Sequence, residues 1–205
     1  MTAPSQLIQV AIAEDQEMVL GALAALLERA EGIQVVAQIR NGRAALEAVA
    51  THQPDVLIVD IEMPEMSGLE VANRLKGHPS VRVIVLTTFA RAGYLRRAMD
   101  AGAYGYLLKD SPARELADAV RKVFRGERVV NPELAAEALS EPDPLTDRER
   151  EVLRLAGEGV SGKDIAARLR LSGGTVRNYL SEARSKLGGV NSVDSARIAR
   201  EKGWL

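Results

Sequence analysis

The sequence predicts an α/β domain with a doubly wound, five-stranded parallel sheet, followed by an all-α domain of four helices. Short apolar runs typical of buried strands alternate five times with segments of helical apolar spacing. Proline and glycine then punctuate a stretch beyond which strand signals are absent. We therefore expect one domain at 1–125, a linker at 126–144 and a second domain at 145–205.

The composition excludes several classes of site. The 205 residues include no cysteine, which rules out disulfides, thiol catalysis and thiolate metal sites. His52 and His78 each stand alone, so a histidine metal cluster is not expected. No apolar run reaches the roughly 18 residues of a membrane span, and residues 1–6 lack the basic start of a signal peptide. We expect a cytoplasmic protein without a membrane partner.

The small net charge of -1 hides a difference between the two parts of the chain. Residues 145–205 carry 12 basic and 8 acidic side chains, a balance of +4. The remainder carries 15 and 20, a balance of -5. This asymmetry favours different partners for the two parts.

Each expected strand of the first part is a short apolar run. The run at 81–86 is rich in β-branched residues, and the run at 56–59 is apolar throughout, as in strands buried on both faces of a parallel sheet. The others lie at 8–13, 33–39 and 105–108. A helix is expected after each strand, because apolar residues recur there at helical spacing. These residues are Leu23 and Leu27, Leu46 and Val49, Leu69 and Ala72, Tyr94 to Ala101, and Leu116 and Val120.

The second part has the signals of successive short helices. T-D-R-E at 146–149 is a capping box that opens the first helix. The third helix carries apolar residues at helical spacing from Val176 to Leu187, and a fourth helix begins near Asn191. A tight turn through 171–172 joins the second helix to the third, which predicts a helix-turn-helix.

Three acidic residues follow strands of the predicted sheet. Asp60 comes directly after the third strand, and Glu14 and Asp15 follow the first. The carboxyl ends of parallel strands share one edge, which is where open α/β sheets bind ligands. Like charges at such short range repel, so either a pKa rises or a divalent cation lies among them. A cluster of oxygen ligands alone suits Mg²⁺.

Two further polar residues are expected at the same edge. Thr87 ends the fourth strand and Lys109 follows the fifth. A hydroxyl and an ammonium group are what a phosphoryl group on Asp60 would need to offset its negative charge.

Four short motifs around these residues resemble the receiver domain of two-component response regulators, whose fold is flavodoxin-like. They are E-D at 14–15, D-I-E-M-P at 60–64, L-T-T at 86–88 and L-L-K-D at 107–110. The resemblance implies that a sensor histidine kinase phosphorylates Asp60, through attack of its carboxylate on phosphorus. It also implies that Asp15, Asp60 and the backbone carbonyl of Glu62 hold Mg²⁺, with Glu14 acting mainly through water.

The resemblance assigns roles to the remaining residues of the site as well. Thr87 and Lys109 match the two positions that sense the phosphoryl group. Tyr106 matches the aromatic position whose rotation reports the state of the domain. A buried tyrosine that packs without switching would have the same sequence context, so both interpretations of Tyr106 stay open.

The second part resembles the LuxR-type DNA-binding domain of NarL/FixJ response regulators. The resemblance is carried by L-T-D-R-E-R-E-V-L at 145–153 and G-T-V-R-N-Y-L-S at 174–181. Arg177, Asn178 and Ser181 lie opposite the core stripe of the third helix and match the base-facing positions of that family. Arg and Asn side chains pair with guanine and adenine edges in the major groove, so the expected partner is double-stranded promoter DNA.

Lys163, Thr175 and Lys186 are the candidates for contacts with DNA phosphates. Such contacts position the recognition helix and make the affinity fall with salt. The alternative for this stretch is that the basic residues form only a solvated helix face.

Together the two resemblances imply a transcriptional regulator and not an enzyme. We expect phosphorylation to promote a homodimer through the first and fifth helices, which would place two DNA-binding domains on a two-fold-related site. Segments such as T-T-F-A-R-A-G-Y at 87–94 and E-K-G-W at 201–204 further resemble bacterial regulators of membrane-lipid desaturation in the cold.

Two other functions share parts of this pattern. A regulator that binds DNA without phosphorylation would use the receiver as a docking module. A phosphohydrolase of the haloacid-dehalogenase type also forms an aspartyl-phosphate, but it carries its nucleophile on the first strand and a second Asp two residues later. In this sequence the strand is the third and the second position is Glu62.

Overall fold

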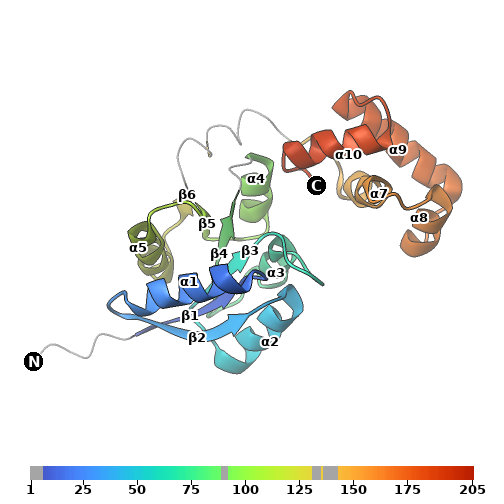
Figure 1. Ribbon diagram of the computed structural model, residues 1–205. Helices are drawn as coiled ribbons and strands as arrows, with labels where there is room; N and C mark the ends of the chain where they lie inside the picture. The colour runs from blue at the N-terminus through green and yellow to red at the C-terminus, as the bar shows by residue number, and fades with distance from the viewer. Residues whose placement is uncertain (1–6, 89–91, 131–134, 136–142) are drawn as a thin grey trace, which may run out of the picture. The chain divides into compact units, whose positions relative to one another are not determined.

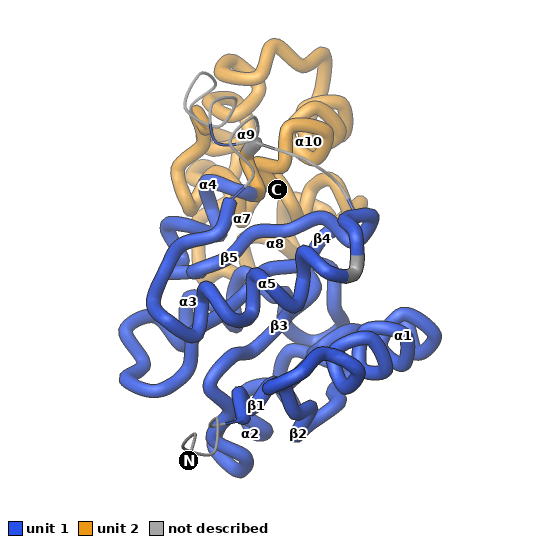
Figure 2. The backbone as a smooth tube through the Cα atoms, turned by 90° about the vertical axis from the view of Figure 1, so that its left-hand side faces the viewer, with its two compact units in different colours: residues 1–90, 95–135 blue, residues 91–94, 136–205 orange. Residues whose placement is uncertain are grey.

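A computed structural model describes residues 7–88, 92–130, 135 and 143–205 of the chain. The described part forms two compact units, one α/β and one all-α, which are coloured separately in Figure 2. The α/β elements are β1 (Ile8–Ala13), α1 (Glu17–Glu28), β2 (Ile33–Ile39), α2 (Gly42–His52), β3 (Val56–Asp60), α3 (Gly68–Arg74), β4 (Arg82–Thr87), α4 (Ala92–Asp100), β5 (Gly105–Leu108), α5 (Ala113–Phe124) and β6 (Val129–Val130). The all-α elements are α7 (Asp147–Gly157), α8 (Gly162–Leu169), α9 (Gly173–Leu187) and α10 (Ser192–Glu201).

The sheet has the order β2-β1-β3-β4-β5-β6, and every pair of neighbouring strands is parallel. This confirms the predicted doubly wound parallel sheet, with the five expected strands in place. Among the described residues a sixth strand, β6, adds to it by pairing Val129 and Val130 with Gly105 and Tyr106. A strand of two residues is too short to produce a periodic signal, which is why the sequence pattern places these residues in the linker.

Helices cover both faces of the sheet, and β3 lies at its centre. Apolar side chains of α1 and α5, including Leu27 and Val120, pack on one face, and α2 and α3 lie on the other (Figure 1). All five residues of β3 are buried. The burial explains the continuous apolar run before Asp60, because a strand covered on both faces has no solvent side for polar residues.

The all-α unit has two small apolar cores. Leu153, Ala183 and Ala199 belong to one, and Val152, Ile165 and Val176 belong to the other. The predicted capping box at the start of α7 is confirmed, because Thr146 Oγ1 accepts from the Glu149 N–H at 3.3 Å and a Glu149 oxygen accepts from the Thr146 N–H at 2.7 Å. Within the described residues the unit thus contains the four helices expected, α8 and α9 forming the helix-turn-helix.

The predicted linker falls largely on residues outside the described part, so its bounds stay a prediction. Its last residues already pack with the helices. Arg150 binds Asp143 at 2.6 Å and donates to the carbonyl oxygens of Trp204 at 2.7 Å and Leu145 at 3.1 Å. Leu145 is itself buried. In the part of the chain that the structure describes, no helix is long and apolar enough to span a membrane.

The Arg150 contacts give a prediction for the stability of the all-α unit. Arg150→Met should lower its free energy of unfolding by about 2 kcal/mol, because Asp143 and two carbonyl oxygens lose their donor. Trp204 is the single tryptophan of the chain, so its fluorescence in a urea titration reports on this unit. Arg148→Met is the matched control, since the Arg148–Glu151 ion pair is exposed and contributes little. Equal midpoints for both variants would contradict the assignment.

Candidate functional site

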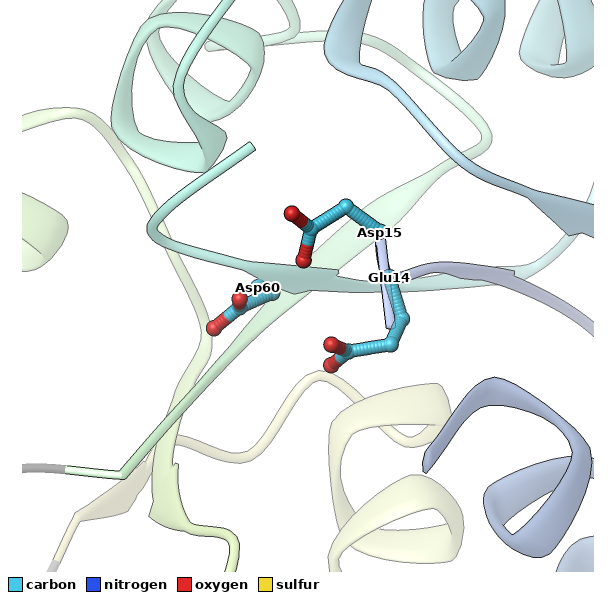
Figure 3. A group of neighbouring side chains, drawn as sticks. All are labelled: Glu14, Asp15 and Asp60. Atoms are coloured by element: carbon cyan, nitrogen blue, oxygen red, sulfur yellow. The ribbon is translucent and has the colours of Figure 1, made fainter. Parts of the chain in front are cut away.

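Three carboxylates meet at the carboxyl edge of the sheet. Glu14, Asp15 and Asp60 each offer an oxygen atom, and these atoms lie within 4.8 Å of one another. Figure 3 shows the three side chains turned toward a common space. The arrangement follows from the pairing of β1 with β3, in which Ala13 lies beside Val59, so that the residues after each strand emerge together. Glu14 and Asp60 are only 1% and 5% exposed, and Asp15 is partly exposed.

Lys109 supplies a positive charge to this cluster. Its Nζ lies 2.7 Å from Glu14 Oε2 and 3.1 Å from Asp60 Oδ2, and its side chain is 9% exposed. The backbone N–H of Lys109 donates to the carbonyl oxygen of Thr87 at 2.7 Å, which fixes the residue beside β4. Burial lowers the pKa of Lys109, but its contacts with Glu14 and Asp60 outweigh burial and leave that pKa above its ordinary value. The ammonium group therefore stays charged.

The charge balance around Asp60 leaves its carboxyl group with an unusual pKa. Burial is the largest cause and raises the pKa from 3.8 to about 6, and the neighbouring Glu14 adds to the rise. Lys109 opposes both effects without cancelling them. Asp60 is thus ionised at neutral pH but holds its charge at a cost in free energy.

Thr87, Tyr106 and Glu62 are the other residues that the sequence predicts for this site. Thr87 is buried at the end of β4, next to β3. Tyr106 is buried in β5, where its backbone lies beside Val85 of β4. Glu62 lies in the loop that follows Asp60. The role of Tyr106 as the aromatic switch stays a prediction.

Gly68, at the start of α3, is a residue of this site that the sequence pattern did not single out. A Cβ atom at this position would overlap the carbonyl oxygen of Asp60 and lie 3.0 Å from Val59 Cγ2. The N–H of Gly68 donates to the carbonyl oxygen of Ile61 at 3.0 Å and closes the loop after β3. The glycine eight residues after Asp60 is visible in the sequence, but only the folded loop shows why it is needed.

Most of the predicted DNA-binding side chains are accessible on the helix-turn-helix. Arg177 and Asn178 are exposed on α9, as is Ser181, and Lys163 is exposed on α8. Thr175 is partly buried in the first turn of α9, where its hydroxyl lies 2.8 Å from that of Ser172. The core stripe of α9 is confirmed as well, because Val176 and Ala183 belong to the two apolar cores.

Lys186, the third candidate for a phosphate contact, is exposed on α9 and pairs with a carboxylate of α7. Its Nζ donates to both carboxylate oxygens of Glu149 at 2.7 Å, and Glu149 is only 1% exposed. Burial raises the pKa of Glu149, but the hydrogen bonds from Lys186 and Thr146 outweigh burial and leave that pKa below its ordinary value. Lys186 therefore ties α9 to α7, and its role as a phosphate contact stays a prediction. The two residues are far apart in the sequence, which hides their pairing.

Each of the two units matches a known protein family. Residues 10–121 match the response regulator receiver domain, and residues 143–199 match the luxR family of bacterial regulatory proteins. The chain belongs to the LuxR family of response regulators. It is therefore a DNA-binding transcriptional regulator with a receiver domain, and its relatives are transcriptional regulators and not enzymes.

Relatives that span the whole response regulator are known. The "Uncharacterized transcriptional regulatory protein YvfU" of Bacillus subtilis (strain 168) is 53% identical over 97% of this chain and 100% of its own length. DesR of the same strain is 49% identical over 97% of this chain and 100% of its own length. A solved structure, "two RcsB dimers bound to two parallel DNAs", is 29% identical with a TM-score of 0.64 and covers 95% of this chain and 98% of that one.

The raised pKa of Asp60 predicts how stability depends on pH in the metal-free regulator. The folded chain holds this proton up to about pH 6 and the unfolded chain only to about 3.8, so the free energy of unfolding falls as the pH rises between these values. Asp60→Asn should remove this penalty and become the more stable protein by up to about 3 kcal/mol above pH 6.

The measurement is urea unfolding followed by circular dichroism from pH 4.5 to 7.5, with EDTA present. Asp118→Asn serves as the control, because Asp118 is exposed and its ion pair with Arg121 contributes little to stability. A stability difference for Asp60→Asn that is constant with pH would contradict the prediction.

Proposed function

We propose that phosphorylation of Asp60 by a sensor histidine kinase switches this regulator between states of low and high affinity for promoter DNA. The observation that carries the proposal is the buried cluster itself, in which Lys109 Nζ lies 3.1 Å from Asp60 Oδ2 and two further acids face the same space. Membership of the response regulator family supports it.

Asp60 has the chemistry of a nucleophile for phosphoryl transfer. One carboxylate oxygen attacks phosphorus, an oxygen–phosphorus bond forms, and the bond from phosphorus to the donor nitrogen of the kinase histidine breaks. The acyl phosphate then carries more negative charge than the carboxylate did. We propose that the Lys109 ammonium, 3.1 Å from Asp60 Oδ2, and the Thr87 hydroxyl group, at the end of the adjacent strand β4, offset that charge.

The donor set around Asp60 fits Mg²⁺. Oxygen atoms of Glu14, Asp15 and Asp60 lie close together, and the backbone of Glu62 is in the adjoining loop. We propose that Asp15, Asp60 and the Glu62 carbonyl hold the ion, with Glu14 acting mainly through water. When bound, Mg²⁺ would neutralise the mutual repulsion of the acids and polarise the phosphoryl oxygens.

For the DNA-binding unit we propose base contacts from Arg177, Asn178 and Ser181 and phosphate contacts from Lys163, Thr175 and Lys186. The exposure of Arg177, Asn178 and Ser181 on α9 and of Lys163 on α8 supports this division. Phosphorylated receivers would pair through α1 and α5 and deliver two such units to a two-fold-related site. The solved structure of two RcsB dimers bound to DNA supports this kind of assembly, since RcsB is a relative of this chain.

Genes of membrane-lipid desaturation are the proposed targets of the regulator. The 49% identity to DesR supports control of membrane-lipid desaturation genes. Transcript profiles of a deletion strain before and after a fall in temperature test this directly. Unchanged desaturase transcripts would exclude that regulon and leave the DNA-binding function intact.

Labelling with radioactive acetyl phosphate in the presence of Mg²⁺ tests the phosphoacceptor. The wild-type chain and the exposed-site control Asp118→Ala should be labelled, and Asp60→Ala should not, because the nucleophilic carboxylate beside Lys109 is then missing. Persistent labelling of Asp60→Ala would overturn the assignment. Steady turnover of phosphoesters by the purified protein would favour a phosphohydrolase instead.

Selection of bound duplexes from a random DNA library tests the division of roles on the helix-turn-helix. Arg177→Ala should lose about 1–3 kcal/mol at one base position and relax the preference there. Lys163→Ala should weaken binding to all duplexes alike and reduce the salt slope by about one. Arg148→Ala on α7 is the control and should change neither quantity. A uniform loss for Arg177→Ala would contradict base recognition by this residue.

A further inference from the structure

The first residue of α2 touches the loop that follows the phosphoacceptor. Gly42 is buried, and a Cβ atom there would overlap the carbonyl oxygen of Met66 and lie 2.8 Å from Met66 Cβ. The backbone of Gly42 does not have a positive φ, so the position requires space and not the conformational freedom of glycine. Helix propensity alone would favour alanine at this position.

Met66 belongs to a tightly folded loop. The loop of residues 61–67 joins Asp60 to α3, and its ends are drawn together by the hydrogen bond from the Gly68 N–H to the Ile61 carbonyl oxygen at 3.0 Å. Glu65 has a φ of 66°, which is uncommon for a residue with a side chain. The N–H of Met66 donates to the Pro64 carbonyl oxygen at 2.8 Å. These constraints leave the loop little room to yield if an atom is added beneath Met66.

The loop is thus held at two points. At its far side the backbone of Met66 rests on Gly42, and at its end Gly68 packs against the backbone of Asp60 itself. The helices that supply these glycines, α2 and α3, lie side by side on one face of the sheet (Figure 1). The exposed Arg43–Glu65 ion pair, at 3.5 Å, crosses the same junction but is too solvated to fix it.

We propose that Gly42 is a positioning residue for the phosphoacceptor site, because its contact with Met66 sets the place of the loop that carries the Glu62 carbonyl. The inference rests on the proposed function of Asp60 and Mg²⁺. Residues that only support the ligands of a metal commonly change its affinity by about 10- to 100-fold when they are replaced. A displacement of the loop by the added methyl group would act in this way.

A purely structural role for Gly42 makes a different prediction. If the glycine serves only to let α2 pack, its replacement lowers stability but leaves the Mg²⁺ affinity of the folded protein unchanged. Affinity for Mg²⁺ and stability must therefore be measured separately on the same variants.

The test compares Gly42→Ala with Gly21→Ala in the full chain. Gly21 lies in α1, where an added Cβ atom would have nothing within 4 Å, so it is a matched glycine-to-alanine control. The readouts are the Kd for Mg²⁺ by calorimetry, the rate of labelling by acetyl phosphate at saturating Mg²⁺, and urea unfolding. Gly42→Ala should raise the Kd about tenfold and slow labelling, and Gly21→Ala should match the wild type in both.

A Gly42→Ala protein with the Kd and labelling rate of the wild type would overturn the positioning role alone. A wild-type chain that neither binds Mg²⁺ nor is labelled would instead refute the proposed function. Met66→Gly covers the case in which Gly42→Ala does not fold, because it loosens the loop without adding atoms to α2. It should also raise the Kd, and an unchanged Kd for Met66→Gly would overturn the inference.

Discussion

The parallel pairing of β1 with β3 is the constraint on which the receiver depends. It places Ala13 beside Val59, and so delivers Glu14 and Asp15 to the same edge as Asp60. Three carboxylates so close together are tolerated because the Lys109 ammonium lies among them, held by its backbone bond to Thr87. Burial, together with the remaining repulsion from Glu14, raises the pKa of Asp60. The site is therefore arranged for binding and reaction at some expense of stability.

The two units use a buried carboxylate in opposite ways. In the all-α unit, Glu149 accepts hydrogen bonds from Thr146 and from Lys186, and its pKa falls below the ordinary value. That carboxylate is fully partnered and fastens α9 to α7. Asp60, in contrast, shares one lysine with Glu14 and keeps a raised pKa. A buried carboxylate whose charge is only partly offset is suited to a reaction. A buried carboxylate whose oxygens are fully hydrogen-bonded is suited to holding helices together.

Much of the fold and of the receiver site could be predicted because it follows from local patterns and strand order. The cluster could be predicted without any tertiary contact, because Asp60 follows a fully apolar run and other polar residues follow the neighbouring strands. The two residues of β6 could not be predicted, since their strand exists only through pairing with β5. The pairing of Lys186 with Glu149 could not be predicted either, because Glu149 lies on another helix. Gly42 and Gly68 likewise show their importance only against the folded backbone.

The central claim is that a phosphoryl group on Asp60 raises the affinity of this regulator for its DNA. The most direct measurement is the affinity of the full chain for a selected duplex, with Mg²⁺ present and before and after treatment with acetyl phosphate. We predict that treatment tightens binding by the wild-type chain and leaves Asp60→Asn unchanged. Equal affinities for the treated and untreated wild-type chain, with Asp60 shown to be phosphorylated, would contradict the account.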